Sequence, residues 1–67
     1  MEDIRTKIKK AVKERGLIQA AIARRAGISP AKLSQIVNLR SGLSLDDYLR
    51  ICGAIGVKPS EMLDDIA

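Results

Sequence analysis

The sequence predicts an all-α fold of five short helices packed around one core. Apolar residues recur three and four positions apart in successive segments, which is the spacing of a helix face that is turned toward a core. Glycine, proline and serine fall at the ends of these segments, where they start and stop helices. No stretch alternates apolar and polar residues as a half-buried strand does. With 67 residues, the chain has room for one domain with one modest core.

The first helix is predicted over residues 3–15. Ile4, Ile8 and Val12 follow a helical period. Gly16 comes directly after the last turn, at the position where glycine commonly ends a helix. The other faces of this helix carry Lys7, Lys9, Lys10 and Lys13, so the helix is amphipathic.

A tight reversal of the chain is predicted at Gly27. Ala23 is small enough to let another helix approach the helix expected over residues 19–26. Gly27 can take the left-handed backbone conformation that ends a helix and reverses the chain. Two helices are therefore expected to cross closely at this point.

A further helix, over residues 30–37, is expected to start directly after the turn. Ser29 supplies a capping oxygen, and Pro30 loses no hydrogen bond at the first helical position. Leu33 and Ile36 are spaced to point back at the preceding helix. This arrangement of two helices around a short turn is a helix-turn-helix.

Two more helices are expected, over residues 45–54 and 59–65. Ser44 with Asp47 three positions later resembles a capping box in which aspartate replaces the usual glutamate. Pro59 lies at the start of the last helix, where proline is well tolerated.

The charges are unevenly distributed along the chain, whose net charge is +4. Residues 1–15 carry six basic and three acidic side chains, and residues 44–67 carry two basic and five acidic ones. Residues 16–43 carry no acidic side chain and four basic ones: Arg24, Arg25, Lys32 and Arg40. A segment without carboxylates suits a surface that faces a polyanion, because a carboxylate there would repel phosphates. The alternative is a solvated helix surface that happens to be basic, and the overlap with the helix-turn-helix favours the first interpretation.

The composition excludes most catalytic and metal-binding arrangements. The chain has no histidine and one cysteine, Cys52, so neither a nucleophile with its base nor an ordinary zinc site can be assembled. We therefore predict no enzymatic activity, no cofactor and no metal, and no small-molecule ligand is evident. Cys52 is interpreted as a small core residue, and Tyr48, the only aromatic residue, as a core or interface residue. No apolar run is long enough to span a bilayer, so a cytoplasmic location is expected.

Residues of matching type and spacing run through the predicted helix-turn-helix: Gln19, Ile22, Ala23, Gly27, Ser29, Leu33, Ser34, Ile36 and Asn38. The pattern continues with Leu45, Leu49, Ile55, Gly56, Val57 and Leu63. In this spacing the chain resembles the Cro and lambda-repressor type of helix-turn-helix family, almost end to end and without a gap. The resemblance implies a five-helix lambda-repressor-like domain that binds a double-stranded DNA operator, usually as a homodimer. It also implies a regulator of transcription associated with the nucleoid, with repression as the expected direction.

The resemblance assigns the residues that face DNA. The helix over residues 30–37 is expected to enter the major groove, with base reading by Ser29, Pro30, Ala31, Lys32, Ser34 and Gln35. Phosphate contacts are expected from Gln19, Asn38, Arg40 and Ser41. Gln35 is the first choice for a base reader, because its amide can pair with adenine through two hydrogen bonds. Pro30 or Ala31 could contact a thymine methyl group, and Lys32 could reach guanine or a phosphate, of which the phosphate is favoured.

The chain departs from the family pattern at four places. Valines at positions 12 and 37 replace an arginine and a glutamate that commonly form an ion pair, so we expect Val12 to contact Val37. Ile18 replaces a capping serine or threonine, which predicts a second helix without a side-chain cap, with Ile18 either packed or the first turn frayed. Leu39 replaces a glycine, which leaves the path of the following loop open, and Leu43 replaces a frequent proline.

A dimer contact is expected on the C-terminal segment, because its apolar residues have little else to cover: Ile55, Val57, Met62, Leu63 and Ile66. The alternative function is a protein-interaction module, such as an antitoxin-like partner, that keeps the scaffold and has a reduced DNA-binding role. Leu39 and Leu43 would serve such a role together with the tail residues. A membrane-active cationic peptide is disfavoured, because the first helix includes acidic residues and the chain has no tryptophan or phenylalanine.

Overall fold

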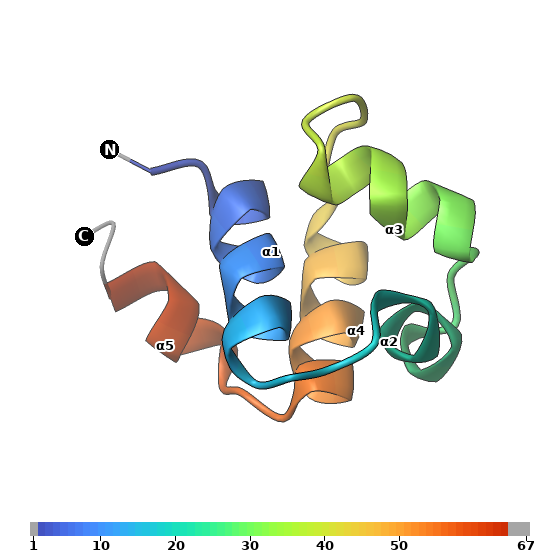
Figure 1. Ribbon diagram of the computed structural model, residues 1–67. Coiled ribbons are helices and arrows are strands. Elements are labelled where there is room, and N and C mark those ends of the chain that lie inside the picture. The colour runs from blue at the N-terminus through green and yellow to red at the C-terminus, as the bar shows by residue number, and fades with distance from the viewer. Residues whose placement is uncertain (1, 65–67) are drawn as a thin grey trace.

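The computed structural model describes residues 2–64, which form five helices and no strand (Figure 1). In chain order these are α1 (Ile4–Glu14), α2 (Gln19–Ala26), α3 (Pro30–Val37), α4 (Leu45–Ile55) and α5 (Pro59–Asp64). The all-α, five-helix fold class is therefore confirmed, and each helix lies close to the range expected for it.

The core lies where the helices meet. α2 packs against both α3 and α4, while α1 packs against α3 and α5. The largest fully buried side chains come from four helices and are Ile8, Ile22, Leu33, Ile36, Ile51 and Cys52. Ala23 is fully buried where α2 meets its neighbours, as its small size predicted. In Figure 1, α3 lies at the right of the molecule, away from α5.

Each of the first four helices is followed within two residues by a residue with a positive φ angle. Three of these residues are glycines, namely Gly16, Gly27 and Gly56. The fourth is Leu39, which follows α3 with a φ of 64°. Leu39 thus takes the backbone conformation that a glycine would take at this position with little strain.

The hydrogen bonds around Leu39 explain why it holds this conformation. The Leu39 amide donates to the carbonyl of Ile36 at 3.1 Å, and the Arg40 amide donates to the carbonyl of Gln35 at 2.8 Å. This pair of bonds is the Schellman motif, which satisfies carbonyl groups at the end of a helix. The loop after α3 therefore starts with a fixed reversal, and this settles the path that the sequence left open.

The other departures from the family pattern are accommodated without polar partners. Val12 and Val37 are both buried in the same core cluster, and their direct contact stays a prediction. Ile18 is the N-cap residue of α2 and makes no side-chain capping bond, which confirms that prediction. Its side chain does not pack, because 71% of the residue is exposed.

Tyr48 and Cys52 are core residues, as expected. The Tyr48 hydroxyl donates to the carbonyl of Pro59 and so connects α4 to α5. Burial raises the pKa of Tyr48 to about 12. Burial also raises the pKa of the Cys52 thiol, which is the opposite of what a reactive cysteine requires.

Candidate nucleic-acid interface

The start of α3 is fixed by the residues that the sequence singled out. The Ser29 hydroxyl accepts a hydrogen bond from the Lys32 amide at 3.0 Å, and Pro30 occupies the first turn. Leu33 and Ile36 are fully buried, so they define the inner face of the helix. The position of these two side chains determines which residues α3 presents to solvent.

The outer face of α3 carries the residues expected to read bases. Five of them are exposed and Ser34 is half-buried; the exposed ones are Ser29, Pro30, Ala31, Lys32 and Gln35. The Gln35 side-chain amide forms no hydrogen bond with any residue in the 2–64 range. Its donors and acceptor are therefore available to a partner.

The residues expected to contact phosphate lie at the first residue of α2 and in the loop after α3. Gln19 is half-buried, whereas Asn38 and Arg40 are exposed. The Asn38 side chain is already engaged within the protein, because it donates to the Ser34 carbonyl at 2.8 Å and accepts from Lys9 Nζ at 2.9 Å. Asn38 thus holds the end of α3 against α1, while Arg40 makes no ion pair within the described part of the chain.

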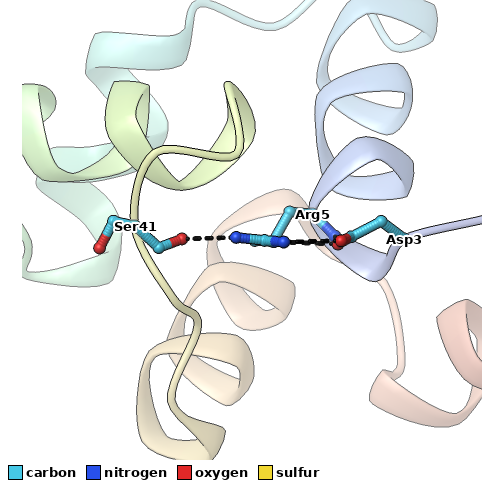
Figure 2. Close-up of polar contacts among 3 residues, drawn as sticks. All are labelled: Asp3, Arg5 and Ser41. Carbon is cyan, nitrogen blue, oxygen red and sulfur yellow. Dashed lines mark hydrogen bonds and ion pairs between the residues drawn. The ribbon is translucent and has the colours of Figure 1, made fainter.

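Arg5 fastens the loop after α3 to the start of α1 (Figure 2). Its Nη1 donates to the Ser41 carbonyl at 2.9 Å, and its Nη2 and Nε donate to the two carboxylate oxygens of Asp3 at 2.7 and 3.0 Å. Asp3 also caps α1 by accepting a bond from the Arg5 amide. These hydrogen bonds from Arg5 lower the pKa of Asp3 to about 2.

Sequence reasoning gave Arg5 no role. Its partner is a backbone carbonyl 36 positions away, and no local pattern reveals such a contact. The nearest signal was the acidic residue two positions before it, at the expected start of the first helix. The Ser41 backbone is therefore held in place by the protein itself, at the point where the loop was expected to contact DNA.

Lys32 is not free on the outer face of α3. Its Nζ lies 2.9 Å from Oδ2 of Asp47 in the first turn of α4. The hydrogen bond from Lys32 lowers the pKa of the Asp47 carboxyl. The predicted cap of α4 is also present, since the Ser44 hydroxyl accepts from the Asp47 amide at 3.1 Å.

The residues expected to form the dimer contact differ in how deeply they are buried. Ile55 and Met62 are buried in the core, because α4 and α5 turn them toward the other helices, so they have no surface to offer a partner. Val57 is half-buried, Leu63 is 47% exposed, and Ile66 lies outside the described residues. The exposed leucines of α4 were not predicted from the sequence. A helical period shows that apolar residues share one face of a helix, but it does not show what covers that face.

The two leucines of α4 are exposed, as is Leu63 of α5. Leu45 is 72% exposed and Leu49 is 47% exposed, four positions apart on one face of α4. Leu45 and Leu63 also line one apolar groove with Ile4 and Leu43. An apolar surface therefore exists near the expected position, formed by α5 together with the start of α4.

Within residues 2–64, the range that the structure describes, no helix is long and apolar enough to cross a membrane. Nor does the range contain a group of three or more histidine, cysteine, aspartate or glutamate residues that could hold a metal ion.

Comparison with known proteins identifies the arrangement of helices. The family described as helix-turn-helix matches residues 8–62. A similar solved structure is the restriction-modification controller protein C.AhdI from Aeromonas hydrophila, with a TM-score of 0.82 and 19% identity over 88% of this chain and 89% of that one. The clp gene regulator ClgR from C. glutamicum has a TM-score of 0.86 and 19% identity over 92% of this chain and 80% of that one. The P22 c2 repressor in complex with a synthetic operator has a TM-score of 0.78 and 19% identity over 92% of this chain and 94% of that one. No curated protein sequence matches the chain.

Proposed function

Because the chain belongs to the helix-turn-helix family, we propose that this DNA-binding transcriptional regulator is a repressor that places α3 in the major groove of its operator. The observation that carries the proposal is the outer face of α3, where the side-chain amide of Gln35 is exposed and makes no hydrogen bond to any of residues 2–64. A helix of this width fits the major groove, where each base pair presents a distinct pattern of donors and acceptors. The similar structures include a repressor solved with a synthetic operator, which supports this choice of partner.

In this proposal each DNA-facing residue has a separate role. Gln35 pairs with adenine through its amide, and Pro30 and Ala31 contact thymine methyl groups. Arg40 neutralises a phosphate, and Gln19 donates to another phosphate from the first residue of α2, where the helix dipole favours an anion. Repression follows from occupation of the operator, and the protein acts in the cytoplasm, at the nucleoid.

We further propose that the protein acts as a homodimer. One α3 helix of eight residues contacts too few base pairs for high specificity. Two copies related by a two-fold axis read two half-sites about 34 Å apart. The surface formed by Leu45, Leu49 and Leu63 is the proposed contact, because it retains exposed apolar side chains.

Selection of bound sites from random DNA duplexes tests the function directly. We expect a palindromic site, since a symmetric dimer reads the same sequence twice. Gln35→Ala should relax the preference at one base position and cost about 1–3 kcal/mol. Arg40→Ala should weaken binding to all sequences alike and reduce the slope of affinity against salt by about 1.

Lys58→Ala is a matched control for Arg40→Ala. Lys58 is exposed in the loop between α4 and α5, and its loss changes the net charge by the same amount without touching α3. We expect it to leave the salt slope close to that of the unaltered protein. Absence of binding to any duplex at low salt would overturn the proposed function.

A further inference from the structure

The ion pair between Lys32 and Asp47 joins the outer face of α3 to the first turn of α4. Nζ of Lys32 and Oδ2 of Asp47 are 2.9 Å apart, and the Lys32 side chain is 47% exposed whereas that of Asp47 is 11% exposed. Among the described residues, Asp47 is the one charged residue that is buried. The lysine expected to contact DNA is thus bound to a carboxylate that has little access to water.

We propose that Asp47 withholds Lys32 from DNA: the pair persists in the complex, and Lys32 contacts neither a base nor a phosphate. This inference rests on the proposed function, because it concerns the surface that α3 presents to the major groove. It makes Asp47, a residue of α4, a determinant of how α3 recognises DNA.

The environment of Asp47 favours the pair over a contact with phosphate. If Lys32 turned toward DNA, the Asp47 carboxylate would stay partly buried without its closest counterion, which is strongly unfavourable. A lysine at an exposed phosphate gains only an interaction that water and salt screen. Since the bond from Lys32 lowers the pKa of Asp47, the carboxylate is ionised at neutral pH and the attraction persists there.

No neighbouring cation replaces Lys32. Arg50, one turn further along α4, also acts on the charge of Asp47, but its Nε pairs with Asp46 at 3.1 Å. The Ser44 hydroxyl, which accepts from the Asp47 amide, also lowers the pKa of Asp47 by hydrogen bonding, but it carries no charge. The Asp47 carboxylate therefore depends on Lys32 for its closest ion pair.

The pair limits what α3 can read. Without the Lys32 ammonium, no charged side chain is left at the front of the helix, which then presents the hydroxyls of Ser29 and Ser34, the apolar Pro30 and Ala31, and the amide of Gln35. Arginine and lysine are the side chains that pair best with guanine, whereas apolar groups contact thymine and glutamine pairs with adenine. The serine hydroxyls can bond to any base, so the part of the half-site that faces α3 is expected to be enriched in A·T pairs.

The experiment compares two substitutions in the same turn of α4. Asp47→Asn removes the partner of Lys32, and Asp46→Asn removes the same charge from an exposed carboxylate that pairs with Arg50 instead. The logarithm of affinity for a selected duplex is measured against the logarithm of salt concentration. We expect Asp47→Asn to steepen the slope by about 0.9, because the released lysine neutralises one more phosphate. Between 50 and 200 mM salt this is an additional loss of about 3.5-fold, and Asp46→Asn should lack it.

A second variant keeps the test decisive if Asp47→Asn alone fails to fold. Lys32→Met combined with Asp47→Asn removes both partners, so that no unpaired charge remains in the fold. This double variant should bind with the salt slope of the unaltered protein. A double variant that falls short of that slope by about 0.9 would show that Lys32 does contact phosphate, and would overturn the inference. If the unaltered protein binds no duplex at low salt, the proposed function fails instead.

Discussion

Leu39 provides the sharpest test of the backbone conformation at the end of α3. Its φ of 64° lies in the left-handed region, which costs an L-residue roughly 1–2 kcal/mol. Glycine avoids this cost but loses about 0.5–1 kcal/mol relative to alanine through the freedom of the unfolded chain. Leu39→Gly and Leu39→Ala both remove the leucine side chain, so the difference between them mainly reports the backbone. We expect Leu39→Gly to be the more stable of the two by about 0.5–1 kcal/mol.

Leu49 is a matched control, because it is also a leucine of similar exposure. Leu39 is 50% exposed and Leu49 is 47% exposed, but Leu49 lies inside α4, where φ is negative. At this position alanine should be more stable than glycine by about 1 kcal/mol, since glycine is a poor helix former. The order of the two variants is thus expected to reverse between Leu39 and Leu49.

Urea unfolding followed by far-ultraviolet circular dichroism measures both differences at one fixed protein concentration. In thermal unfolding, a difference of 1 kcal/mol corresponds to about 4–8 °C in Tm for a domain of this size. Alanine more stable than glycine at both positions would refute the assignment of Leu39 to the left-handed conformation, and with it the Schellman end of α3.

Three further predictions concern stability and the loop. Arg5→Ala should speed amide exchange at and around Ser41 and weaken binding to all duplexes alike, because the loop loses its attachment to α1; Arg15→Ala, with the same change of charge, should do neither. Ile18→Ser should raise the free energy of unfolding by about 1 kcal/mol by supplying the missing cap of α2, and an unchanged Tm would contradict this. Because the pKa of Tyr48 is raised from 10.0 to about 12 in the folded protein, its contribution to stability is complete below pH 10 and is lost as the pH rises toward 12. Absorbance titration of this single tyrosine checks the pKa, and Tyr48→Phe should reduce the loss of stability between pH 10 and 12, while the buried Cys52 thiol keeps its own contribution.

The parts of the fold that follow from neighbouring residues could be predicted from the sequence. Ser29, Pro30 and Gly27 act on the backbone within one turn, so their presence predicted where α2 ends and α3 begins. The spacing of Leu33 and Ile36 likewise predicted the inner face of α3, and hence which side chains remain outside. Local rules sufficed because each of these effects operates over four residues or fewer.

The same rules could not decide which surface an apolar residue covers. Ile55 and Met62 belong to apolar faces with a regular helical period, and the period is identical whether a face packs within one chain or against another. The structure turns these two residues inward and leaves Leu45 and Leu49 exposed. Which of these residues become buried depends on the relative positions of three helices. The sequence of a single segment does not give these positions.

At the candidate site, charged residues from segments that are separate in sequence lie on one surface. The charge of one segment therefore does not describe the charge of that surface. Residues 16–43 contain no acidic side chain, which made all their cations look equally available to DNA. The fold instead brings Asp47 from the acidic end of the chain against Lys32, while Arg40 has no such partner among residues 2–64. Two cations from one basic segment therefore differ: Lys32 joins α3 to α4, whereas Arg40 is available for the proposed phosphate contact. The pairing of charges between helices determines which cations are available to DNA. The net charge of a segment is a poor measure of this availability.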